Sequence, residues 1–201
     1  GLVAIGIVDP KRVKSNAAAQ AGDVLILGKP LGVGILSAAL KKDLLDDAGY
    51  QEMIANTTKL NSAGPDLAKL PGVHALTDVT GFGLAGHTLE LARGSKLTAQ
   101  IQWNQVPLLS NVQSLADQGV ITGASNRNWQ SYGSDVCLPA QFTPAQQALL
   151  TDPQTSGGLL VSCSADAVNA VLEIFKQHHF TSACVIGQMT NKQTQHLEVL
   201  L

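Results

Sequence analysis

The chain has 201 residues, of which 45% are hydrophobic and 14% are charged, and its formal net charge is -2. This composition allows a buried core and excludes a disordered chain. The absence of a large Lys/Arg cluster argues against nucleic-acid binding, and no apolar run approaches the roughly 18 residues of a membrane helix. The three cysteines lie far apart and predict neither a zinc site nor a disulfide framework, so we expect reduced thiols in a cytoplasmic protein.

The first eight residues, GLVAIGIV, have the composition of a β-strand, but no segment precedes them with which they could pair. A chain that opens inside such a run and lacks an initiator Met is expected to be part of something longer. The small and polar residues that follow are typical of a connector. We therefore expect residues 1–20 to be the last strand of one domain plus a linker, and residues 21–201 to form a second domain.

Strands and helices are expected to alternate along the rest of the chain, which predicts an α/β or α+β layered domain. The gaps between them are marked by glycine, proline and the ends of apolar periodicity. The predicted strands cover residues 24–27, 73–79, 96–103, 156–164, 182–190 and 196–201. The predicted helices cover residues 32–62, 84–95, 108–119, 143–154 and 165–179. Gly64-Pro65 ends the helix over 32–62, and Arg93 and Gly94 end the helix over 84–95. Thr143 is expected to cap the start of the helix over 143–154. Residues 121–134, ITGASNRNWQSYGS, have no clean period and are expected to form a long ordered loop.

Residues 75–95, ALTDVTGFGLAGHTLELARGS, predict a strand, a Gly-rich turn and a helix. The glycines have the GxGxxG spacing of a dinucleotide-binding turn, but residues 100–108 offer no acid for a ribose hydroxyl, and Asp78 would repel a pyrophosphate. Two other interpretations stay open. In the first, the glycines have a purely structural role, because they allow a positive φ and close packing of the turn. Alternatively, Asp78 holds Mg²⁺ between itself and phosphates, with the amides around Gly81 to Gly83 available to anionic oxygen. His87 is expected to be packed rather than catalytic.

Two further motifs are structural when each is considered alone. LTDPQTSGGLLV, residues 150–161, predicts a helix-to-strand connection with flexible backbone before the strand. GKPLGVG, residues 28–34, lacks the Gly-Lys-Ser/Thr order of a P-loop and is expected to be a structural turn.

Four motifs taken together resemble the selenophosphate synthetase family, also called selenide, water dikinase. In this order and spacing they are GKPLGVGIL, TDVTGFGLAGH, RNWQSYG and DPQTSGGLLV. The resemblance runs over essentially the whole chain and corresponds to the later part of the family's sequence. It implies an α+β domain of the aminoimidazole ribonucleotide synthetase C-terminal type, with a mixed sheet covered by helices. Another ATP-dependent member of that superfamily is the alternative, and a free-standing nucleotide-binding module or a purely structural lid or dimerisation domain are the others.

The resemblance implies a two-domain cytoplasmic homodimer that makes selenophosphate, AMP and phosphate from ATP, selenide and water. In the family the reactive Cys or selenocysteine, its neighbouring Lys, two metal-binding aspartates and most of the ATP site lie in an N-terminal domain, which this chain is expected to lack. No catalytic residue is therefore assigned, and the chain alone is expected to be inactive. What carries over is Asp78 as a Mg²⁺ ligand, with Thr77, Thr80, Gly81 and Gly83 as the supporting turn of the nucleotide site.

Overall fold

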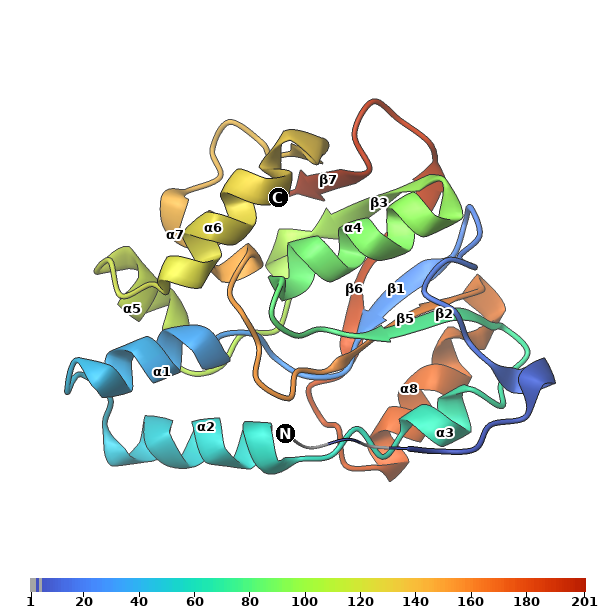
Figure 1. Ribbon diagram of the computed structural model, residues 1–201, viewed down its shortest axis with the longest axis horizontal. Coiled ribbons are helices and arrows are strands. Elements are labelled where there is room, and N and C mark those ends of the chain that lie inside the picture. Colours follow the sequence, from blue (N-terminus) through green and yellow to red (C-terminus); the bar gives the residue numbers. More distant parts are fainter. Residues whose placement is uncertain (1–2, 4) are drawn as a thin grey trace.

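Seven strands form one mixed sheet in the computed structural model, which describes residue 3 and residues 5–201 (Figure 1). The order across the sheet is β2-β5-β1-β6-β3-β7-β4. The pairs β3–β7 and β7–β4 are parallel, and the others are antiparallel. The strands are β1 Val24–Leu27, β2 Val73–Asp78, β3 Leu97–Gln102, β4 Val136–Cys137, β5 Leu159–Cys163, β6 Cys184–Asn191 and β7 Leu197–Leu200. The predicted α+β architecture is confirmed.

Helices cover both faces of this sheet and enclose two hydrophobic clusters. The larger cluster lies under α1, α4, α5, α6 and α7, and the smaller one lies between β2-β5-β1 and the pair α3 and α8 (Figure 1). The helices are α1 Val33–Lys41, α2 Asp47–Thr58, α3 Gly64–Leu67, α4 Gly83–Ser95, α5 Val112–Asp117, α6 Gly123–Tyr132, α7 Pro144–Leu150 and α8 Val168–Gln177. Short 3₁₀ turns are Pro10–Arg12, Trp103–Gln105, Gly133–Asp135 and Ala165–Ala167. A search of the described residues finds no helix with the length and hydropathy of a membrane span.

The expected loop over residues 121–134 is wrong, because most of it is helix α6. Thr122 caps this helix by accepting a hydrogen bond from the amide of Ser125. The buried residues Ser125, Asn128 and Tyr132 have helical spacing, but they are polar and the segment is hydrophilic on average, so it lacks the apolar stripe by which a buried helix face is recognised.

Three predicted helix boundaries differ in the structure, and one strand was not predicted. The single helix expected over residues 32–62 is two helices, because α1 ends at its Lys41 and the side chain of Asp46 caps α2. Pro65 lies in the first turn of the short helix α3 rather than ending a longer helix, since the N–H that proline lacks has no partner in a helix's first turn. Helix α4 extends past Gly94, and Lys96 takes the left-handed conformation after it, with φ 58°. Strand β4 is too short to have been predicted.

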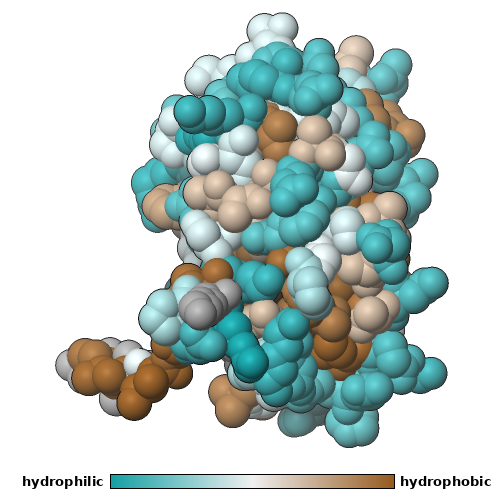
Figure 2. Space-filling view, turned by 90° about the vertical axis from the view of Figure 1, so that its right-hand side faces the viewer, coloured by the Kyte–Doolittle hydropathy of each residue, from teal (hydrophilic) through white to brown (hydrophobic). Residues whose placement is uncertain are grey.

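The apolar side chains near the N-terminus project away from the domain. Residue 3 and residues 5–9 have no regular secondary structure, and the side chains of Val3, Ile5 and Ile7 are 85%, 92% and 105% exposed. Figure 2 shows this apolar segment standing away from the body of the molecule. The strand expected over residues 1–8 falls partly on residues 1, 2 and 4, outside the described ones. The assignment of residues 1–20 to a neighbouring domain's last strand and a linker stays a prediction.

Candidate functional site

Two motifs that are far away in the sequence contact the loop between β2 and α4, residues 79–82, and a third contacts one of those two (Figure 1). The segment with the DPQTSGG sequence approaches this loop through its backbone. The amide of Gln154 donates to the carbonyl of Thr80 at 3.0 Å, and the amide of Val79 donates to the carbonyl of Gly158 at 2.9 Å. Gly157 allows this approach, because an added Cβ would lie 1.8 Å from the carbonyl oxygen of Val79.

Helix α6, which carries the RNWQSYG motif, holds the same loop from another side. Nδ2 of Asn128 donates to the carbonyls of Gly81 and Thr151 at 2.9 and 3.0 Å. The hydroxyl of Tyr132 donates to the carbonyl of Phe82 at 2.5 Å. Burial raises the pKa of Tyr132 above its ordinary value, so this phenol stays a hydrogen-bond donor. This role was not predicted, because the motif was expected to lie in a loop rather than in helix α6. The i, i+4 spacing of the two side chains was the available signal.

The GKPLGVG and DPQTSGG motifs meet at the start of α1, where side chains cap the helix from a distance. Oδ2 of Asp152 accepts from the amide of Gly34 at 2.9 Å, and Oε1 of Gln154 accepts from the amide of Gly32 at 3.2 Å. The two oxygens also accept from the other amides of residues 32–35. All four N–H groups that a helix start leaves unpaired are thereby satisfied. The structural interpretation of both motifs is confirmed.

The lysine of GKPLGVG is also structural. Lys29 is only 2% exposed, and its Nζ donates to the carbonyls of Asn56, Lys59 and Ser156 at 3.0, 2.6 and 2.6 Å. Two of these carbonyls close the C-terminal end of α2, where a cation is favourable. Burial, and then the positive charge of Lys59, lowers the pKa of Lys29 to about 8. Lys29 therefore ties α2 to the DPQTSGG segment, unlike a P-loop lysine, which binds phosphate.

The buried carboxyl of Asp152 is expected to make the stability of the folded chain depend on pH. Burial raises the pKa of its carboxyl from 3.8 to about 7, against the opposing effect of its hydrogen bonds. Its Oδ1 has no partner among the described residues. Because the folded pKa lies above the unfolded one, this group stabilises the fold most at low pH, and its contribution is lost as the pH rises from about 4 to about 7. We expect Asp152→Asn to flatten that dependence in urea unfolding measured at several pH values. Equal slopes for the two proteins would contradict it.

The predicted site residues lie on or beside the 79–82 loop. Asp78 ends β2 and is exposed, and its carboxylate makes no hydrogen bond or ion pair with the described residues. The hydroxyl of Thr77, one residue earlier, donates to the carbonyl of Asp78 at 3.4 Å. Thr80 is partly buried, Gly81 is exposed and Gly83 is buried. The free carboxylate is therefore the one charged group that the turn itself presents.

The start of α4 lacks the caps that α1 has. No side chain caps α4 at Phe82, and in the described part of the chain the amides of Gly81 and Phe82 donate no hydrogen bond. The expectation that all the amides from Gly81 to Gly83 are available needs a correction, because the Gly83 amide donates to Thr80 at 3.0 Å. Unpaired amides at a helix N-terminus favour an anionic partner.

The close-packing interpretation of the glycines is confirmed for two of them. Gly83 has φ 69°, and an added Cβ would lie 2.6 Å from the backbone of Thr151. At Gly86 it would meet the side chain of Phe82 at 2.4 Å, whereas Gly81 has open space. A dinucleotide-binding βαβ unit needs a parallel pair, but β2 is an edge strand that pairs with β5 in the antiparallel direction.

The described residues fit a Mg²⁺ site only in part. Asp78 offers carboxylate oxygens and Thr80 a hydroxyl oxygen, both of the type that Mg²⁺ takes. No group of three or more His, Cys, Asp or Glu side chains in the described segments is placed to hold a metal ion. A metal bound at Asp78 would therefore need phosphate, water or another part of the protein to complete its coordination.

The mixed sheet with its covering helices, together with the contacts around the 79–82 loop, defines the chain as the C-terminal domain of an AIR synthase-like protein. The chain belongs to the family described as AIR synthase related protein, C-terminal domain, which matches residues 20–199. It is 66% identical over 191 residues to the selenide, water dikinase of Paraburkholderia xenovorans (strain LB400), and 67% identical over 189 residues to that of Pseudomonas straminea. These matches cover 95% and 94% of this chain but 54% and 53% of the relatives, so the chain spans about half of their length. The resemblance to selenophosphate synthetase is confirmed.

Solved structures share the fold at low sequence identity. The thiamine-monophosphate kinase of Stenotrophomonas maltophilia K279a matches with a TM-score of 0.68 and 17% identity, over 96% of this chain and 54% of that chain. The E. coli hydrogenase maturation protein HypE matches with a TM-score of 0.67 and 20% identity, over 92% of this chain and 49% of that chain. A HypE structure in complex with ATP gives a TM-score of 0.68 at 18% identity, over 96% and 51% of the two chains.

Proposed function

We propose that this chain is the C-terminal half of a selenide, water dikinase, an enzyme that makes selenophosphate, AMP and phosphate from ATP, selenide and water. The observation that carries the proposal is its 66% identity over 95% of the chain with a protein of that name. The contacts of the RNWQSYG and DPQTSGG motifs with the 79–82 loop support it, because these residues, far apart in the sequence, together hold that loop in place. Another ATP-dependent member of the superfamily is the alternative, favoured by the fold shared with HypE in complex with ATP.

In this proposal Asp78 is a Mg²⁺ ligand at the phosphates of ATP. Its exposed carboxylate has no partner among the described residues, and the amides of Gly81 and Phe82 beside it are unpaired. Thr77, Thr80, Gly81 and Gly83 shape the turn. The metal, when bound, would neutralise phosphate charge, which is the main requirement of phosphoryl transfer. Asp78 would hold it, and the loop contacts from α6 and the DPQTSGG segment would keep Asp78 in place.

The remaining ligands and the nucleophile would come from an N-terminal half like that of the relatives. The exposed apolar segment around Val3, Ile5 and Ile7 would then join a sheet of that half rather than remain in solvent. A homodimer in the cytoplasm belongs to the same proposal.

The proposal predicts that AMP forms only when both halves are present. We expect ATP and selenide to yield AMP with a protein in which a relative-like N-terminal half precedes Gly1, and to yield none above background with the 201-residue chain alone. The AMP is measured by chromatography, with selenide omitted as the control. AMP formation by the shorter chain would contradict the division of the site, and its absence from the folded longer protein would overturn the proposed function.

A further inference from the structure

A cavity of about 210 Å³ lies between α2 and the connection from α8 to β6. Residues 28–30 of the GKPLGVG motif form one wall, and the other walls are one face of α2, Leu109 and residues 180–182. Figure 1 shows the C-terminal end of α2 beside this connection. None of residues 77–83 lines the cavity, so it is separate from the site proposed for Mg²⁺.

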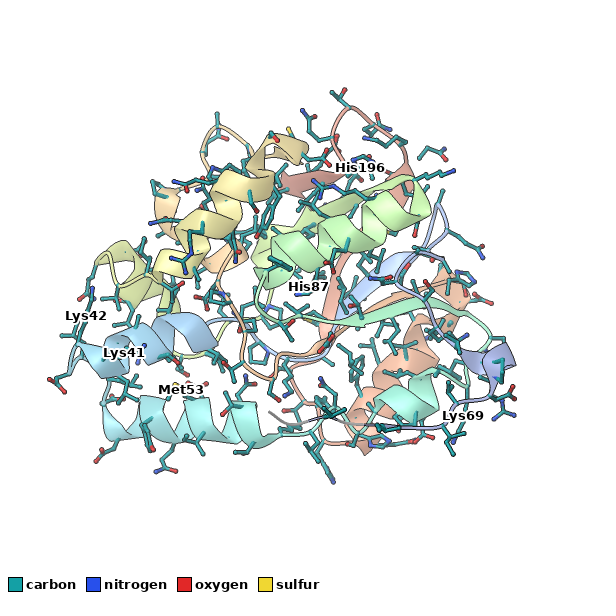
Figure 3. The ribbon with its side chains drawn as sticks, viewed as in Figure 1. Lys41, Lys42, Met53, Lys69, His87 and His196 are labelled. Carbon is teal, nitrogen blue, oxygen red and sulfur yellow. The ribbon has the colours of Figure 1, made fainter. Side chains whose placement is uncertain are left out.

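Helix α2 directs a polar stripe toward this cavity. Glu52, Asn56 and Lys59 all line it, and their i, i+4 and i+7 spacing places them on one side of the helix and its C-terminal end. The apolar contact of α2 with α1 is made by the neighbouring Met53, which Figure 3 shows between the two helices. A helix face that points into its own domain is usually apolar, so the three polar side chains indicate a function for the cavity.

The two charged members of the stripe have no partner of opposite charge among the residues that the structure describes. The carboxylate of Glu52 accepts from the amide and the hydroxyl of Ser110 at 3.1 Å each, and both of these donors are neutral. The ammonium group of Lys59 donates to the carbonyl of His179 and lies 4.3 Å from the centre of the Phe180 ring. Partly buried charges without a counter-ion are unfavourable, so both favour a ligand that supplies one.

The side-chain amide of Asn56, between these two charges, makes no hydrogen bond with the described residues. Its Nδ2 is buried, and exchanging the nitrogen and the oxygen would not change this result, because neither atom has a partner. A buried polar group without a partner lowers the free energy of unfolding. The exposed hydroxyls of Thr181 and Ser182 on the facing wall are also unpaired within the described segments.

We propose that this cavity binds a small amino acid, a molecule that carries both an ammonium and a carboxylate group. Glu52 accepts from the ammonium group, and Asn56 and Lys59 donate to the carboxylate. The buried ammonium group of Lys29 adds positive charge near Lys59. The volume is below the roughly 300–1,000 Å³ of pockets for drug-sized ligands, which restricts the ligand to a small molecule. The inference goes beyond the proposed function and does not depend on it, since every group belongs to this chain.

The first test is a titration of the 201-residue chain followed by nitrogen-15 NMR of its backbone amides. The probes are glycine, β-alanine, γ-aminobutyrate and ε-aminohexanoate, in which the two charges lie progressively further apart. Acetate and methylammonium, which carry one charge each, are the controls. We expect saturable shifts at residues 180–182 with at least one amino acid, with a Kd of about 1 mM, and at least about tenfold weaker binding of both controls. No saturable shift below about 50 mM, or equal affinity for acetate, would overturn the inference.

Two substitutions separate binding from folding. Glu52→Gln keeps an acceptor for Ser110 and removes the charge, so amino acids should bind about tenfold more weakly while acetate is unaffected. Asn56→Ala should weaken binding about tenfold without lowering the melting temperature, because it removes a buried amide that has no partner. Asn126→Ala makes the same change at an exposed position of α6 and should leave binding unchanged. Wild-type affinity in either pocket variant, or a large fall in the melting temperature of Asn56→Ala, contradicts the proposal.

The same titration of a protein with both halves tests the cavity in the longer chain. Binding with similar affinity is the expected result. Loss of binding there would show that the N-terminal half covers the cavity and would overturn the inference for that protein. AMP formation, which tests the proposed function, would be unaffected by either result.

Discussion

Asp78→Asn is expected to lower Mg²⁺-dependent AMP formation by about 100-fold or more in a protein that joins this chain to an N-terminal half like that of its relatives. The substitution keeps the shape of the side chain and removes one anionic ligand, and with it part of the charge neutralisation at the phosphates. The fold should be nearly unchanged, because the carboxylate is exposed and has no hydrogen bond or ion pair with the described residues. A Mg²⁺ titration of activity and a melting curve of each protein measure the two effects separately.

Asp117→Asn is the matched control for this prediction. Asp117 is an exposed carboxylate on α5, whose Oδ1 accepts from the side chain of Gln113 at 3.0 Å. Its replacement should change neither activity nor melting temperature by much. Normal activity of Asp78→Asn at ordinary Mg²⁺ concentrations would remove Asp78 from the metal site. A large fall in the melting temperature without metal or nucleotide would instead make Asp78 a structural residue of the turn.

The second large effect is expected on stability, from Gly157→Ala. The new Cβ would lie 1.8 Å from the carbonyl oxygen of Val79 and 2.8 Å from Cβ of Gln154. Neither the carbonyl nor the segment around Gln154 can move freely, because both belong to the hydrogen-bonded contact between the two motifs. We expect the free energy of unfolding to fall by about 3 kcal/mol or more, as for severe overpacking. Urea unfolding of the 201-residue chain measures the loss.

A methyl group at Gly64 provides the comparison. Its Cβ would meet the side chain of Leu159 at 3.5 Å, which is ordinary contact, and the residue has no positive φ. Gly64→Ala should therefore leave the free energy of unfolding within about 1 kcal/mol of the wild type. A stability of Gly157→Ala as high as that of Gly64→Ala would show that the β2–α4 loop can move away from the DPQTSGG segment. The loop would then be a less rigid support for Asp78 than its contacts indicate.

Local chemistry in the sequence was sufficient to predict most of the fold. The strands at β1, β2, β3, β5, β6 and β7 follow from β-branched and apolar runs bounded by turn residues. Helix α7 follows from Thr143 as its cap and Pro144 in its first turn, and the structure forms the full capping box with Gln146. The exposed position of Asp78 at the end of a strand was also predictable, because a carboxylate followed by a Gly-rich turn marks a strand end. Each of these features depends on residues only a few positions apart.

Tertiary structure alone decided the features that depend on distant partners. Helix α6 buries the polar Asn128 and Tyr132, whose acceptors lie on the 79–82 loop, so no stripe of apolar residues marked it in the sequence. The amides at the start of α1 are capped by Asp152, more than a hundred residues away along the chain. A buried hydrogen bond between such distant groups leaves no apolar pattern in either segment that would identify its partner. The sequence by itself therefore determined the elements and the carboxylate, and the packing of those elements decided what holds the carboxylate in place.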